Sequence, residues 1–251
     1  SSAASDVYKR QEVTLAAVVS DPATQRKFSI LDPKLTPSMA ALDGALMTGL
    51  PPAITAATGM DALTHAIEAY LSRNAFDDTD RHALAATRLI MENLPAAYAD
   101  GSDSETRQHM AQASYYAGMA FTKAGVGYVH AIAHAFGGRY HTPHGLANAI
   151  VLPHVLDFSR DAVVPRLAKL AEASGIEGHG NTPKADQFIA RVRELCREFD
   201  IPDTLEALRA GDIPELARGA LKEAHLTYAV PKYMDQKTCE NLIRRMLHVA
   251  T

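Results

Sequence analysis

The sequence contains little of several residue types, and each scarcity argues against a class of protein. Among its 251 residues there is no tryptophan, and only 6% are aromatic. With a formal net charge of -4 and no basic stretch, the chain offers neither stacking platforms nor a positive surface, so nucleic acid is not an expected partner. No apolar run approaches the roughly 18 residues of a membrane-spanning helix, and no membrane association is expected.

Cysteine is also scarce. The only two, Cys196 and Cys239, lie in segments whose pattern predicts helix, so a disulfide framework is not expected and both thiols are predicted to be buried or half-buried. Such cysteine usage is typical of a reducing compartment. Because no charged and apolar signal segment opens the chain, the expected location is the cytoplasm.

Apolar patterning divides the chain into a short β-rich part and a long helical part. Short apolar runs broken by Asp-Pro pairs predict strands over residues 13–19, 28–31 and 39–42. After Pro51 and Pro52 the apolar residues recur at helical spacing, so the expected fold is mainly α. Thr182 and Asp235 are predicted to cap two helices. The predicted helices span residues 54–72, 79–97, 104–122, 127–137, 145–157, 161–173, 183–198, 213–223 and 236–248.

Three histidine-bearing segments carry the residues best suited to bind a metal. Asp61 and His65 lie four residues apart in a predicted helix, which puts both side chains on one face. His130 and His134 have the same spacing in an otherwise apolar helix, where buried imidazoles need polar partners. His141 and His144 follow in a turn-forming segment, and a histidine there can fold back toward them. Each pair alone also fits a solvated or core helix face, but together they favour a metal site with one spare histidine for proton transfer.

These segments resemble the signature segments of the iron-containing (group III) alcohol dehydrogenases. The resemblance rests on residues 50–68, which read LPPAITAATGMDALTHAIE, and on residues 129–138 and 142–145, which read VHAIAHAFGG and TPHG. It implies a nucleotide-binding α/β half followed by an all-helical metal-binding half of the dehydroquinate synthase-like fold. The resemblance places the four metal ligands at Asp61, His65, His130 and His144, and a further active-site histidine at His134.

The same resemblance implies cofactors and partners. The metal is iron(II) or zinc, the second cofactor is NAD or NADP, and the substrate is a small alcohol or aldehyde; a homodimer is one implied assembly. Lys27 matches a lysine near the dinucleotide, although a solvated lysine on a strand edge fits its charged surroundings equally well. His141 either lines the substrate pocket or caps a turn.

The chain departs from the family in lacking a glycine-rich phosphate-binding loop, because Gly44, Gly49 and Gly59 are isolated. We therefore expect three parts. Residues 1–11 are an unrelated or disordered lead, residues 12–50 are a remnant of the α/β nucleotide-binding domain, and residues 51–251 are the helical metal-binding catalytic domain. The chain is thus interpreted as a fragment with impaired cofactor binding.

The expected function is a metal-dependent, NAD(P)-linked alcohol dehydrogenase or aldehyde reductase. Two alternatives stay open. A helical metal-dependent hydrolase uses the same ligand types to generate hydroxide, although the chain has no adjacent His-Asp pair of the kind found in helical phosphohydrolases. A non-catalytic metal-binding fragment fits the missing nucleotide loop, and metal binding without nicotinamide-linked turnover distinguishes it.

Overall fold

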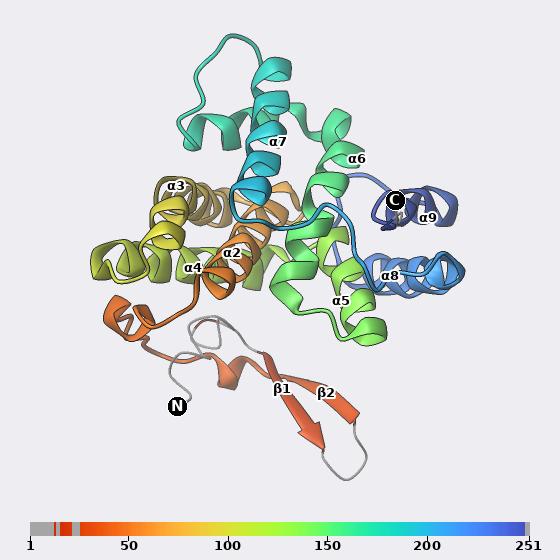
Figure 1. The fold of residues 1–251 in the computed structure, drawn as a ribbon, viewed down its shortest axis with the longest axis horizontal. Helices are drawn as coiled ribbons and strands as arrows, with labels where there is room; N and C mark the ends of the chain where they lie inside the picture. Colours follow the sequence, from red (N-terminus) through yellow and green to blue (C-terminus); the bar gives the residue numbers. More distant parts are fainter. Residues whose placement is uncertain (1–12, 14–15, 22–25, 249–251) are drawn as a thin grey trace.

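The computed structural model describes residue 13, residues 16–21 and residues 26–248. Within these residues a β-hairpin precedes a body of packed helices, and Figure 1 shows the hairpin at the edge of that body. The mainly helical prediction is confirmed. The lead expected at residues 1–11 lies outside the described residues.

The hairpin consists of β1, Ala16–Asp21, and β2, Arg26–Leu31. The two strands are antiparallel, with a register that runs from Ala16 opposite Leu31 to Asp21 opposite Arg26. They overlap the strands predicted over residues 13–19 and 28–31.

The strand predicted over residues 39–42 is wrong, because this segment is irregular. It lies between two short 3-10 helices, η1, Pro33–Leu35, and η2, Gly44–Met47. Asp43 caps η2 by accepting a hydrogen bond from the Ala45 amide at 2.9 Å, which turns the chain away from an extended path. Met39 is 88% exposed, so this apolar side chain is not packed against a sheet or the core.

Eight α-helices in the described part of the chain form the body of the molecule. Their bounds agree with the predicted helices to within a few residues, with one exception described below. None of them is both long and apolar enough to cross a membrane. They are α2, Pro52–Leu71; α3, Asp77–Ala99; α4, Ser104–Ala124; α5, Tyr128–Tyr140; α6, His144–Ala173; α7, Asn181–Glu198; α8, Ile213–Thr227; and α9, Gln236–Arg244.

The exception is α6, which joins the two helices predicted over residues 145–157 and 161–173. The joint is a bend at Val163, whose φ of -132° and ψ of 20° are not helical. Pro165 follows two residues later, and a proline inside a helix removes one backbone donor and clashes with the preceding turn. The pattern therefore predicted the interruption, and the structure places it at Val163 between the two helical halves of one bent element.

One of the two predicted helix caps is confirmed. Asp235 accepts a hydrogen bond from the Thr238 amide at 2.7 Å at the start of α9. The prediction for Thr182 is wrong, because α7 begins at Asn181, two residues before the predicted start, and its cap position is Gly180. Gly180 has a φ of 84°, a conformation that glycine adopts without a steric penalty, so the chain turns into the helix before Thr182 is reached.

Helix α2 is the central element. Fifteen of its 20 residues are buried, which explains why its sequence is apolar or small on nearly every face. It packs against α3, α4 and α6, while α5 packs against α6 and α8. The polar residues of α2, α5 and the start of α6 therefore share one region of the interior, and this region holds the candidate site.

Candidate metal centre

The three helices bring the four predicted ligands together. Asp61 and His65 come from α2, His130 from α5, and His144 is the first residue of α6. The Asp61 Oδ1 atom lies 3.4 Å from His144 Nε2, 3.8 Å from His130 Nε2 and 3.6 Å from His65 Nδ1. Asp61, His65 and His130 are buried and offer ligand atoms within 4.8 Å of one another, whereas the His144 side chain is 44% exposed.

Hydrogen bonds fix the orientation of two of these imidazoles. His65 Nδ1 lies 2.8 Å from the main-chain oxygen of Asp61, and His130 Nδ1 lies 2.6 Å from Glu68 Oε2. Because a carbonyl and a carboxylate oxygen only accept, each Nδ1 must carry the hydrogen. Each Nε2 then keeps its lone pair, which is the form in which an imidazole binds a metal.

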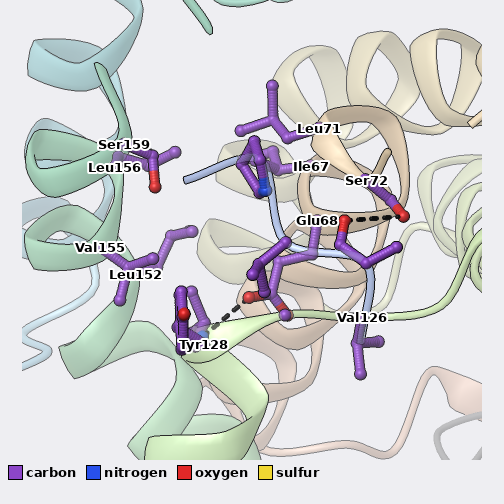
Figure 2. Close-up of a pocket in the computed structure, with 15 residues that line it drawn as sticks. Ile67, Glu68, Leu71, Ser72, Val126, Tyr128, Leu152, Val155, Leu156 and Ser159 are labelled. Carbon is purple, nitrogen blue, oxygen red and sulfur yellow. Dashed lines mark hydrogen bonds between the residues drawn. The ribbon is translucent and has the colours of Figure 1, made fainter. Parts of the chain in front are cut away.

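Glu68 holds His130 from a buried position on α2. Its second oxygen accepts a hydrogen bond from the Val129 amide at 2.7 Å. A side chain on Gly127 would meet this carboxylate, since a Cβ there would lie 2.8 Å from Glu68 Oε1. Glu68 lines a small, mostly apolar cavity of about 30 Å³. Figure 2 shows Glu68 among the lining side chains, with Leu156 on α6 also at this cavity. The carboxylate is buried, and low polarity around it strengthens its hydrogen bonds.

Asn148 lies at the same point, one turn after His144 on α6, and is fully buried. Its Nδ2 lies 2.6 Å from Asp61 Oδ1, 3.1 Å from His144 Nε2 and 3.3 Å from His130 Nε2. Three potential ligand atoms thus lie around the Asn148 amide nitrogen, which donates to the Asp61 carboxylate, while Asn148 Oδ1 has no hydrogen-bond partner among the described residues. Convergent lone pairs from one carboxylate and imidazoles are a donor set that fits a divalent ion.

His134 lies beside this cluster. Its ring stacks on His144 at 5.3 Å between centroids and lies 6.0 Å from the ring of His130. His134 Nδ1 is 2.7 Å from Glu223 Oε1 on α8. Burial lowers the pKa of His134, but the hydrogen bond and charge of Glu223 outweigh burial and leave this pKa above its ordinary value.

The carboxylate that pairs with His134 has a second partner. The Tyr228 hydroxyl donates to the same Glu223 oxygen at 2.5 Å. Burial raises the pKa of the Glu223 carboxyl, yet the hydrogen bonds from His134 and Tyr228 outweigh burial and hold this pKa below its ordinary value. Burial and the neighbouring carboxylate raise the pKa of Tyr228 far above its ordinary value, so its phenol keeps its proton.

Two weaker predictions have different outcomes. Lys27 lies in β2 opposite Ser20, but its side chain lies outside the described residues, so its proposed role near a dinucleotide stays a prediction. His141 ends α5 with a φ of 56°, and its amide donates to the Gly137 carbonyl at 3.1 Å. The structure therefore supports a turn-capping position for His141.

Sequence reasoning did not assign Glu68, Asn148, Glu223 or Tyr228. Glu68 lies seven residues after Asp61, and Asn148 four residues after His144, so helical spacing could have placed both on ligand-bearing faces. Glu223 is 89 residues from His134, and no local pattern connects them. The cysteines follow expectation, since Cys196 and Cys239 are free and buried.

A comparison with known proteins identifies the family. A model of the C-terminal region of the Fe-containing alcohol dehydrogenase family matches residues 55–247. The chain belongs to this family. The iron-containing alcohol dehydrogenase resemblance inferred from the sequence is thus confirmed.

Three relatives show how closely the chain matches this family. A 1,3-propanediol dehydrogenase of Klebsiella pneumoniae is 45% identical over 218 residues, covering 85% of this chain and 56% of the relative. A solved 1,3-propanediol oxidoreductase matches with a TM-score of 0.89 and 41% identity, over 94% of this chain and 63% of that one. A sulfoacetaldehyde reductase of Bifidobacterium kashiwanohense, solved with NAD+, matches with a TM-score of 0.84 and 26% identity, over 94% and 61%. The chain therefore spans less than two thirds of each relative.

Proposed function

We propose that the chain is the metal-binding part of an NAD(P)-linked alcohol dehydrogenase or aldehyde reductase. The observation that carries this proposal is that Asp61, His65 and His130 offer ligand atoms within 4.8 Å of one another, while His144 Nε2 lies 3.4 Å from Asp61 Oδ1. The names of the relatives support the reaction class, since they are alcohol dehydrogenases and aldehyde reductases. The NAD+ bound to the sulfoacetaldehyde reductase supports a nicotinamide as the second cofactor.

In this proposal Asp61 and the three histidines hold iron(II) or zinc, because three imidazoles and one carboxylate suit either ion. The ion supplies Lewis acidity that favours the ionised form of an alcohol oxygen, while the nicotinamide accepts or returns the hydride. The chain itself orients these groups. Glu68 keeps His130 in the ligand tautomer, and the Asn148 amide donates to the Asp61 carboxylate.

His134 is the residue proposed to exchange a proton with the substrate oxygen. Its side chain is 45% exposed, and it stacks on a proposed ligand, so a small molecule bound at the centre can reach it. An imidazole titrates near neutral pH and is suited to this task. We further propose that β1 and β2 belong to the nucleotide-binding part, with Lys27 near the dinucleotide.

The test is metal stoichiometry measured alongside turnover. The chain is purified anaerobically, loaded with iron(II) or zinc, and compared with His130→Ala and with His179→Ala, a control on an exposed loop. One ion per chain that is lost in His130→Ala and kept in His179→Ala supports the site. Oxidation of 1,3-propanediol with NAD+ or NADP+ supports the dehydrogenase.

The same experiment separates the alternatives. Metal binding without nicotinamide-linked turnover indicates a metal-binding fragment, and metal-dependent hydrolysis of a phosphate ester indicates the hydrolase. A wild-type chain that binds neither ion overturns the ligand assignment.

A further inference from the structure

Two residues outside the proposed ligand set surround the Nδ1 side of His134. Glu223 belongs to α8, which packs against α5, the helix that carries His134. Its Oε1 atom accepts two hydrogen bonds, one from His134 Nδ1 at 2.7 Å and one from the Tyr228 hydroxyl at 2.5 Å. Tyr228 follows directly after the end of α8, so one short stretch of chain supplies both groups.

This arrangement determines which imidazole nitrogen is available. A carboxylate oxygen only accepts, so His134 Nδ1 carries the hydrogen that points to Glu223. The other nitrogen, Nε2, has no hydrogen-bond partner among the described residues. The ring also stacks on His144 with only 19° between the planes, which fixes its tilt. Nε2 is therefore the nitrogen left for a molecule bound at the metal centre.

Tyr228 restricts the position of the carboxylate in turn. The Glu223 side chain is 34% exposed, and a glutamate so placed can otherwise turn toward water. The phenol hydroxyl holds one oxygen at the His134 side by donating to it. Tyr228 also lines a hollow together with Arg73 and Tyr233.

A purely structural role does not explain this arrangement well. The His134 and Glu223 side chains are 45% and 34% exposed, and ion pairs exposed to this degree contribute little to folding. The pair acts on His134 itself, because without an acceptor at Nδ1 a neutral imidazole is free to carry its hydrogen on Nε2. Loss of the pair should therefore change the site much more than the fold.

We propose that Glu223 and Tyr228 are positioning residues for His134, which fix its hydrogen on Nδ1 and leave Nε2 facing the oxygen of an alcohol or aldehyde substrate. This inference rests on the proposed function, in which His134 exchanges a proton with that oxygen. In the alcohol-to-aldehyde direction, the substrate O–H bond breaks and its proton passes to Nε2, while the hydride leaves the carbon for the nicotinamide.

The tautomer can be read directly from the 15N chemical shifts of the histidine ring nitrogens. The chain is labelled with 15N-histidine, loaded with zinc and recorded at alkaline pH, where the ring is neutral, with His134→Gln used to assign the signals. We expect the Nδ1–H form in the wild type and in Glu223→Gln, because the glutamine carbonyl still accepts. Glu223→Leu should shift the population toward the Nε2–H form, and Tyr228→Phe should do so to a smaller extent.

Glu215→Gln provides a matched control, since it makes the same charge change at an exposed position on the same helix. An Nδ1–H population in Glu223→Leu equal to that of the wild type overturns the proposal. An unchanged population in Tyr228→Phe removes Tyr228 from it. Should Glu223→Leu fail to fold, Glu223→Ala, which also removes the acceptor at His134 Nδ1, takes its place, and a wild-type Nδ1–H population in it overturns the proposal.

Kinetics supply a second readout. In an active protein we expect Glu223→Leu to lower kcat by about 100-fold or more, the scale of a general acid or base, with KM within a few-fold of the wild type. Glu223→Gln should recover most of the loss. Equal losses in both variants, or a change confined to KM, overturn the positioning role. If the wild type does not turn over, the proposed function fails, while the ring-nitrogen shifts still decide the tautomer.

Discussion

Replacing Glu68 by glutamine changes the hydrogen bonds behind the metal centre while keeping the shape of the side chain. The carboxylate accepts from both Val129 N and His130 Nδ1. A glutamine has one accepting oxygen and one donating amide. Either the Val129 amide loses its acceptor, or His130 moves its hydrogen to Nε2 and no longer offers a lone pair to a metal.

The expected magnitudes follow from this geometry. The Glu68 side chain is only 7% exposed, so water does not replace the lost bond, and a hydrogen bond to a charged group contributes about 1.5–3 kcal/mol. For a chain of this length, a loss of about 2 kcal/mol lowers the Tm by roughly 4–8 °C. Loss of a carboxylate that orients a ligand histidine lowers metal affinity by about 10–100-fold.

The assay is a zinc titration against a chelator of known affinity, followed by thermal unfolding of the metal-free protein. Glu177→Gln, which makes the same chemical change on the exposed loop between α6 and α7, is the control. We expect Glu177→Gln to behave as the wild type in both measurements. If Glu68→Gln binds zinc as tightly as Glu177→Gln, the reasoning about the His130 tautomer is refuted.

Three further predictions concern other parts of the structure. Because the pKa of His134 is raised in the folded chain, its contribution to stability is full below pH 6.5 and is lost as pH rises through the folded pKa. Because the pKa of Glu223 is lowered, its contribution is full above pH 4.5 and is lost as pH falls through the folded pKa. A double-mutant cycle of His134 and Glu223, measured by chemical denaturation, should therefore give a coupling energy near 0.5 kcal/mol at about pH 5.5 and a smaller one at about pH 8.5. The same coupling energy at both pH values would contradict the pairing. In Gly145→Ala the added Cβ would overlap a main-chain carbonyl of α2. We therefore expect calorimetry to show about 1–3 kcal/mol of destabilisation, and zinc titration to show weaker binding. An unchanged Tm would contradict this packing. Burial raises the thiol pKa of Cys196 to about 11 and of Cys239 to about 12, so neither should react with a thiol reagent until the chain unfolds, and fast labelling of the native protein contradicts their burial.

The sequence determined the features that depend on local spacing. Helical periodicity predicted every α-helix in the described part of the chain, and a four-residue spacing put Asp61 with His65, and His130 with His134, on shared helix faces. The signature segments identified the family without any tertiary information, because they contain these same residues.

Only the tertiary structure decided how those faces meet and what surrounds them. The partners of His134 and His130 are Glu223 and Glu68, which lie 89 and 62 residues away along the chain. Asn148 reaches its central position because α6 packs on α2. Residues 39–42 have a local apolar pattern typical of a strand but remain irregular, since a strand requires a neighbouring strand to accept its backbone hydrogen bonds. Periodicity reports which side of an element is apolar, whereas the contact between two elements depends on packing across the whole chain.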